Sequence, residues 1–121
     1  MIGCAPHLKI QGDSRTLAVY SGATLAARMP ARIDVVTAAA AGEAALEERG
    51  YIISRREGTS GRMVVVGKTP AAGWRRHTDR AVHFRAIRRP RGVRVEIHVG
   101  RVGDEAESRA ILDATLASLG L

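Results

Sequence analysis

The chain has 121 residues, of which 45% are hydrophobic and only 3% aromatic, and it carries a formal net charge of +7. This length suits one domain with an aliphatic core. The single cysteine, Cys4, excludes an internal disulfide, and no apolar run approaches the roughly 20 residues of a membrane span.

The positive charge is concentrated in the middle of the chain. Residues 51–103 hold thirteen basic and three acidic side chains, whereas residues 1–50 are balanced and residues 104–121 are acidic. Such a field attracts phosphates, acidic proteins or anionic lipid headgroups. The alternative is a solvated basic face without a dedicated polyanion partner, because nearly every base is arginine and the bias runs through the whole composition.

The first segment of the chain, residues 1–15, has no clear hydrophobic period. We interpret it as a tail or tether that precedes a single α+β domain over residues 16–121. Residues 16–29 alternate weakly between apolar and polar side chains. This alternation predicts one strand, or two short strands joined by a turn at Ser21-Gly22.

A helix is predicted over residues 32–49, after Pro30. Its apolar positions recur at helical spacing on one face, at Val35, Ala39, Gly42 and Leu46. Gly50 then provides the left-handed residue with which helices commonly end.

Four further strands are predicted before the last helix. The first starts at residues 51–54, and the others span residues 62–68, 76–88 and 93–99. The turn-forming stretches EGTSG, TPAAG and RPRG separate them. The last two strands pair best with Arg88 opposite Val93, because apolar side chains then face apolar ones. The same register places Arg85 opposite Glu96, an attractive pair.

The last helix is predicted to begin at Asp104, because Asp104 and Glu107 have the spacing of a capping box. The complete pattern predicts an α+β fold: a two-layer sandwich in which one antiparallel sheet of four to five strands carries two helices on one face. The expected order is β-α-β-β-β-β-α. The other face of the sheet is expected to be polar and rich in arginine.

No motif points to catalysis, and we expect a protein that is not an enzyme and needs no cofactor. Gly67-Lys68-Thr69 resembles the end of a phosphate-binding loop, but the upstream glycine and the following helix are missing. A metal site would have to combine side chains that share one face of the predicted sheet: His77, Asp79, His83 and His98. Facing histidines on a sheet are more often ordinary surface residues, so no metal site is predicted.

Arginines of the predicted strands and turns could form a stripe along one sheet face. These candidate polyanion-binding residues are Arg55, Arg56, Arg75, Arg76, Arg85, Arg88, Arg89, Arg91 and Arg94. Guanidinium groups make bidentate contacts with phosphates, so nucleic acid is one possible partner. Against that reading, Trp74 is the only aromatic side chain expected near the polar face, whereas single-strand binding platforms stack bases on aromatic rings.

The stretches VEIHVGRVGDE (residues 95–105) and SRAIL (108–112), with ALEERGY (45–51) and Ser60-Gly61, resemble a family of small bacterial lipoproteins of unknown function. The most specific part is the C-terminal V-G-x-x-G-D-E-x-x-S-R-x-I-L signature. Its residues have a structural reading as a two-glycine turn followed by a helix cap. The residues assigned to that role are Gly100, Gly103, Asp104, Glu107 and Arg109.

The resemblance implies that Cys4 is a lipidation site. Residues 1–4, Met-Ile-Gly-Cys, match the end of a lipobox, and Cys4 would then carry a lipid anchor, although the basic and apolar regions of a signal peptide are not present in the sequence as it stands. With such a peptide upstream the protein would be lipid-anchored in the cell envelope; otherwise it would be cytoplasmic with an idle thiol.

The sequence therefore predicts a small binding or structural module, associated with the cell envelope as a lipoprotein domain. Its partner would be an anionic lipid, a polymer or an envelope protein. The alternative is a cytoplasmic nucleic-acid-binding protein that uses the arginine-rich face.

Overall fold

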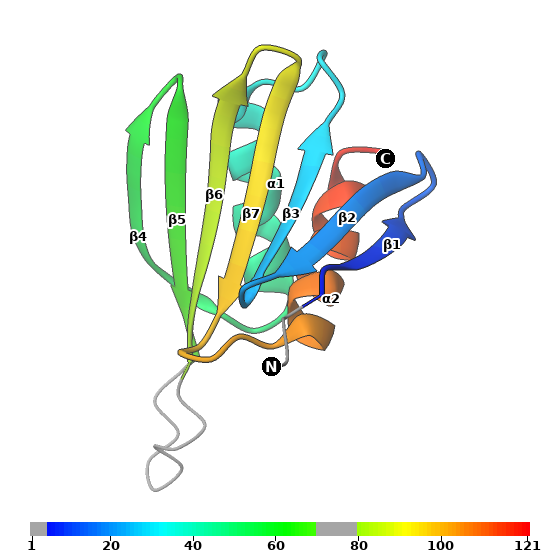
Figure 1. Cartoon of the computed structure of the whole chain (residues 1–121). Coiled ribbons are helices and arrows are strands. Elements are labelled where there is room, and N and C mark those ends of the chain that lie inside the picture. Colours follow the sequence, from blue (N-terminus) through cyan, green and yellow to red (C-terminus); the bar gives the residue numbers. More distant parts are fainter. Residues whose placement is uncertain (1–4, 70–79) are drawn as a thin grey trace, which may run out of the picture.

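The computed structural model describes residues 5–69 and 80–121. The elements in these residues are β1 (His7–Gln11), β2 (Thr16–Ser21), β3 (Thr24–Met29), α1 (Val35–Glu48), β4 (Ile52–Thr59), β5 (Arg62–Lys68), β6 (Ala81–Arg89), β7 (Gly92–Val99) and α2 (Glu105–Ser118). The strands form one antiparallel seven-stranded sheet of order β1-β2-β3-β7-β6-β5-β4. Figure 1 shows both helices behind the same face of this sheet.

The predicted class, α+β with two helices on one face of an antiparallel sheet, is confirmed, but the predicted strand number and order are wrong. The described residues form seven strands in the order βββαββββα, not four to five strands. Residues 16–29 fold as two strands, β2 and β3, and β1 lies inside the predicted tail, residues 1–15. The predicted strand 76–88 is described from Ala81 onward as β6, and residues 76–79 lie outside the described part of the chain.

The register predicted for the β6–β7 hairpin is confirmed. Arg88 pairs with Val93, Phe84 with Ile97, Arg85 with Glu96 and His83 with His98. The alternation along β7 is strict, and a slip by one residue would turn its valines and isoleucine to solvent. The register of this hairpin therefore follows from the alternation along β7.

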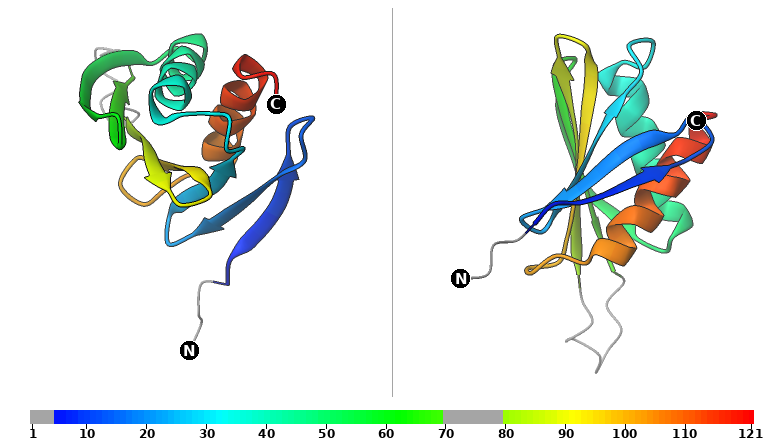
Figure 2. Two further views of the ribbon diagram at one scale, coloured as in Figure 1. Left: turned by 90° about the horizontal axis from the view of Figure 1, so that it is seen from above. Right: turned by 45° about the vertical axis from the view of Figure 1, so that its right-hand side comes forward.

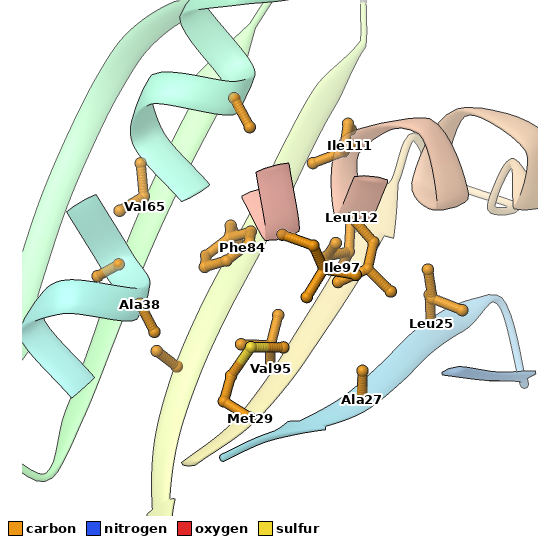
Figure 3. Close-up of a cluster of buried hydrophobic side chains, with 14 of the residues drawn as sticks. Leu25, Ala27, Met29, Ala38, Val65, Phe84, Val95, Ile97, Ile111 and Leu112 are labelled. Carbon is orange, nitrogen blue, oxygen red and sulfur yellow. The ribbon is translucent and has the colours of Figure 1, made fainter. Parts of the chain in front are cut away.

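The core lies between the sheet and the helices (Figure 3), and it depends on close approach of α1 to β6. Gly42 is buried on α1, and a Cβ atom there would lie 2.4 Å from the ring carbons of Phe84. Alanines 38, 39 and 45 flank it on the buried face of the helix. The Phe84 ring therefore packs directly against the part of α1 that lacks large side chains.

The strand β1 has an inverted polarity. His7, Lys9 and Gln11 point toward the helical layer, whereas Leu8 and Ile10 point to the opposite face, because their partners Val19 and Leu17 alternate with the buried Ala18. On the helix side, the Gln11 amide donates to the Arg109 carbonyl oxygen (2.9 Å) and to the Asp113 carboxylate (2.8 Å). His7 contacts the Glu105 carboxylate in the same way, so two of the polar side chains of β1 have partners on α2.

Arg109 is the main link between α2 and the β1–β2 hairpin. The residue is only 8% exposed, and its guanidinium donates to the His7 carbonyl oxygen (2.8 Å), the Gln11 side chain (2.9 Å) and the Glu105 carboxylate (3.0 Å). Because a buried guanidinium needs its donors satisfied, this set of bonds holds β1 in place. In Figures 1 and 2 the hairpin runs obliquely to the other strands and lies beside α2.

The turn before α2 has the conformation that its glycines suggest. Gly100 and Gly103 both have positive φ angles (69° and 87°), and the Asp104 side chain caps the helix by accepting from the Glu107 backbone N–H at 3.0 Å. The Glu107 carboxylate does not complete the capping box. It instead binds Arg49, at the C-terminal end of α1, and Tyr51, which precedes β4.

Candidate binding face of the sheet

The open face is the face of the sheet that lies away from α1 and α2. Side chains reach it from alternate positions of every strand, opposite the buried positions such as Phe84 and Val95. Its central part is polar and charged, with His83, Arg85, Arg94, Glu96 and His98 from β6 and β7.

Among the predicted polyanion-binding arginines of the open face, three have an acidic neighbour there. Arg55 lies 3.6 Å from Glu57, Arg85 lies 3.5 Å from Glu96, and Arg94 lies 2.9 Å from the same Glu96 carboxylate. These pairs are exposed, so their contribution to stability is small. They nevertheless offset part of the positive charge that the sequence suggested for this region.

The other predicted arginines do not continue the stripe. Arg56 lies on the helix side, where it binds Glu43 of α1, and Arg88 falls on the same side by register with the buried Val93. Arg89 and Arg91 lie at the β6–β7 turn, and Arg75 and Arg76 lie outside the described residues. The described arginines therefore do not form the single stripe expected from the sequence.

The apolar patch is the part of the open face formed by β1 and β2. Its members are Leu8, Ile10 and Leu17, which are 57%, 54% and 49% exposed, together with the partly buried Val19. They are cross-strand neighbours, because Leu8 pairs with Val19 and Ile10 with Leu17. Adjacent exposed aliphatic side chains of this kind form a surface on which a partner or a membrane can dock.

A basic cleft of about 800 Å³ adjoins the apolar patch. It runs along the outward side of β2 and β3, where the small Ala26 leaves space next to Leu17 and Val19. The described residues that line it include four arginines and no acidic side chain; the arginines are Arg15, Arg28, Arg91 and Arg94. One wall of the cleft is thus aliphatic and the other cationic.

Arg28 and Arg94 stand directly opposite each other on β3 and β7. Like charges in this position repel, and folding alone gives no reason for them. Arg94 is bridged to Glu96, whereas Arg28 has no acidic partner among the residues that the structure describes. The cleft therefore concentrates positive charge that the neighbouring side chains leave uncompensated.

His83 and His98, the two histidines of the open face, lie opposite each other on β6 and β7. His98 Nδ1 lies 2.9 Å from the Ala23 carbonyl oxygen, which can only accept, so Nδ1 carries the proton. Burial lowers the pKa of His83, and the nearby Arg85, Arg55 and His98 lower it further. Within residues 5–69 and 80–121, no three His, Cys, Asp or Glu side chains gather as a metal site would require, and His77 and Asp79 lie outside these ranges.

The sequence reasoning missed the residues that distinguish this face: Leu8, Ile10, Leu17, Arg15 and Arg28. The signal that could have found them is the alternation of His7 to Gln11, which has the period of a strand but places its apolar residues on the solvent side. Cys4, the predicted lipidation site, lies outside the described residues. None of the described helices is long and apolar enough to cross a membrane.

A comparison of the sequence with models of protein families finds no match, and a comparison with curated proteins finds none.

Proposed function

We propose that this chain is a non-catalytic binding module that docks on anionic lipid surfaces through the apolar patch and the basic cleft. The observation that carries the proposal is the inverted polarity of β1, which turns Leu8 and Ile10 to solvent next to Leu17. Leaving these aliphatic side chains in water is unfavourable unless a partner covers them for part of the time. The unpaired Arg28 beside them supplies the charge that an anionic partner would meet.

The two halves of this surface match the two halves of a lipid interface. Aliphatic side chains enter the boundary between headgroups and acyl chains, while arginines attract the anionic phosphates. A single buried CH₂ group contributes about 0.8 kcal/mol and each arginine near the surface about 1 kcal/mol. Three aliphatic side chains and a few arginines therefore favour weak, reversible docking that a second anchor would strengthen.

The resemblance to small bacterial lipoproteins supports such a second anchor at Cys4. Cys4 precedes His7, the first residue of β1, by three positions, a distance that the chain spans in at most about 10 Å. A lipid on Cys4 would therefore hold the β1–β2 hairpin next to the bilayer. The proposal places the protein in the cell envelope if a signal peptide precedes Met1, and on the cytoplasmic side of the membrane if none does.

Nucleic-acid binding stays the alternative function. The open-face arginines 55, 85 and 94 would contact phosphates, but all three have an acidic neighbour. The open face as described carries no aromatic side chain, since Tyr20, Tyr51 and Phe84 all point toward the helical layer. The apolar patch would have no role in binding a phosphate polymer, and this difference separates the two functions.

The test is co-sedimentation of the unlipidated chain with vesicles of phosphatidylcholine, alone or mixed with phosphatidylglycerol. The double variant Leu8→Thr/Ile10→Thr places β-branched residues, which favour strands, at both positions of β1 but removes most of the aliphatic surface. Ile52→Thr is the matched control, because Ile52 is 59% exposed on β4 at the opposite edge of the sheet. We expect the double variant to bind mixed vesicles more than about tenfold more weakly, and Ile52→Thr to bind like the wild type.

Equal vesicle binding by the double variant and the wild type would overturn the proposal. A single-stranded oligonucleotide that binds equally well to the wild type and the double variant, with no vesicle binding by either, would favour the alternative function.

A further inference from the structure

The ladder between β2 and β3 ends before the strands do. The two strands are joined by a two-residue turn, so the pair that flanks the turn is hydrogen-bonded, and so is every second pair after it. Leu17 and Arg28 would form the third such pair, but the pairing stops at Ala18 and Ala27. The pairing of Ala18 with Ala27 includes the bond from the Arg28 N–H to the Leu17 carbonyl oxygen. The groups that face the opening without a ladder partner are therefore the Leu17 N–H and the Arg28 carbonyl oxygen.

This opening coincides with the basic cleft, because both Leu17 and Arg28 line it. One backbone donor and one backbone acceptor without ladder partners, in a cationic cleft, have a defined chemical preference. The Leu17 N–H and the arginines suit an anion. The Arg28 carbonyl oxygen suits a hydrogen-bond donor close to that anion.

Arg91 is held at the end of the cleft by the close packing of the β6–β7 turn. A Cβ atom at Gly92 would lie 2.7 Å from the Met29 carbonyl oxygen, so only glycine lets the turn approach β3 this closely. Gly92 has a φ angle of 131°, which also favours glycine. The Arg91 position is therefore fixed by the backbone next to the end of β3, on the same cleft as Arg28.

We propose that the cleft between β2 and β3 is a headgroup subsite for a phosphodiester that carries hydroxyl groups, as in phosphatidylglycerol. This inference rests on the proposed function and names the lipid class that it would recognise. Arg28 and Arg91 bind the phosphate, with Arg94 beside them. A hydroxyl group of the headgroup donates to the Arg28 backbone carbonyl oxygen, and the acyl chains leave along the apolar patch.

The same geometry disfavours other headgroups. An ammonium group, as in phosphatidylserine or phosphatidylethanolamine, would enter a cleft lined by four arginines and no acid, which repels it. Inorganic phosphate as a dianion brings the charge but little donor capacity for the Arg28 carbonyl oxygen. Affinity is therefore expected to follow the hydroxylated phosphodiester rather than charge alone.

The experiment titrates the unlipidated chain with dihexanoyl phosphatidylglycerol below its micelle concentration, by calorimetry or by amide chemical shifts. Dihexanoyl phosphatidylserine and inorganic phosphate are the comparison ligands. The variants are Arg28→Gln and Arg91→Gln, with Arg62→Gln as the matched control, since Arg62 is an exposed arginine on the open face of β5, away from the cleft. We expect each cleft variant to weaken phosphatidylglycerol binding by about tenfold and Arg62→Gln by less than about twofold. Shift changes should centre on the Leu17 and Arg28 amides.

Equal weakening by Arg28→Gln, Arg91→Gln and Arg62→Gln would overturn the subsite, because only the net charge of the face would then matter. Equal affinity for the glycerol and serine lipids would overturn the headgroup class. If mixed vesicles bind the wild type and both cleft variants equally, the subsite fails while the proposed function stands. If the soluble lipid binds in the cleft but no vesicle binds the chain, the proposed function fails while the subsite stands. Unfolding midpoints of the variants within error of the wild type show that the comparison is between folded proteins.

Discussion

The Tyr51 hydroxyl donates to the Glu107 carboxylate at 2.7 Å and thereby joins the start of β4 to the first turn of α2. The same carboxylate accepts from Nε and Nη2 of Arg49, at 3.0 Å and 2.6 Å. Arg49 caps the C-terminus of α1, so one carboxylate connects the two helices and the sheet. Burial, and then the bond to the anionic Glu107, raise the pKa of Tyr51.

We expect Tyr51→Phe to lower the free energy of unfolding by about 1 kcal/mol, because it removes a charge-assisted hydrogen bond while Arg49 still satisfies Glu107. Urea unfolding followed by circular dichroism measures the change. Tyr20→Phe is the control, since Tyr20 has no side-chain hydrogen bond within the described residues and is only partly buried. A cost for Tyr20→Phe as large as that for Tyr51→Phe would show that the Tyr51–Glu107 bond contributes nothing.

Acid should destabilise the fold through the carboxylates of this region. The bonds from Arg49 and Tyr51 lower the pKa of Glu107, and the Glu107 backbone N–H followed by Arg80 lowers the pKa of Asp104. A carboxylate with a lower pKa in the folded state stabilises the fold above its unfolded value, about 4. That stabilisation is lost as the pH falls through the folded values.

The expected result is a fall of the urea midpoint below about pH 4 that is shallower in Glu107→Gln. The Glu107→Gln variant and the protein with which it is compared should both carry His83→Gln. The reason is that the lowered pKa of His83 also reduces the free energy of unfolding once the pH drops below about 6.5. Identical acid profiles with and without Glu107→Gln would contradict this account.

Gly42→Ala should destabilise the fold, although alanine is the better helix former by about 1 kcal/mol. Its Cβ atom would meet the Phe84 ring at 2.4 Å, and overpacking in a closed core costs about 1–3 kcal/mol. The measurement is again the unfolding midpoint. In a Phe84→Leu background the ring is gone, and Gly42→Ala should then be neutral or stabilising. A cost that is unchanged in that background would show that Phe84 is not the cause.

Arg109→Lys should loosen the β1–β2 hairpin selectively. A lysine ammonium cannot reproduce the fork of bonds that Arg109 makes to His7, Gln11 and Glu105. We expect faster hydrogen exchange of the amides in β1 and little change in the amides of the β6–β7 hairpin. The variant and the wild type are compared under conditions in which their free energies of unfolding are equal. Uniform acceleration in both hairpins would indicate global destabilisation instead.

Cys4→Ser tests the proposed anchor. If the gene is expressed with its own upstream region, the wild-type chain should be recovered in the membrane fraction with an acylated N-terminus at Cys4, and Cys4→Ser in the soluble fraction. The mass of the native N-terminus is the direct measurement. A wild-type chain that begins at unmodified Met1 would exclude the anchor and leave the docking surface of β1 and β2 to act alone.

The elements that the sequence predicts correctly are those whose pattern agrees with their final environment. Val93, Val95, Ile97 and Val99 alternate strictly and are all buried, so the β6–β7 register follows from β7 itself. The helix α1 has a strong apolar face and ends before Gly50, whose φ angle is 92°. In both cases the local period and the burial select the same structure.

The elements that the sequence does not predict are those whose pattern disagrees with their environment. β1 turns Leu8 and Ile10 to solvent and His7, Lys9 and Gln11 inward, which is acceptable only because α2 offers Arg109, Glu105 and Asp113 on that side. Those residues lie about a hundred positions away in the chain, so no local pattern reveals them. The basic cleft depends in the same way on residues from β2, β3 and the β6–β7 turn.

By itself, the sequence determined the class of this protein, its two helices on one sheet face, and the register of its central hairpin, because alternation and helical periodicity are local consequences of burial. Only the tertiary structure decided the number and order of the strands, the division of the arginines between the two faces, and the placement of an apolar patch beside a basic cleft. These features arise from pairings between distant segments, where the free energy of a residue depends on a neighbour that the sequence order does not specify.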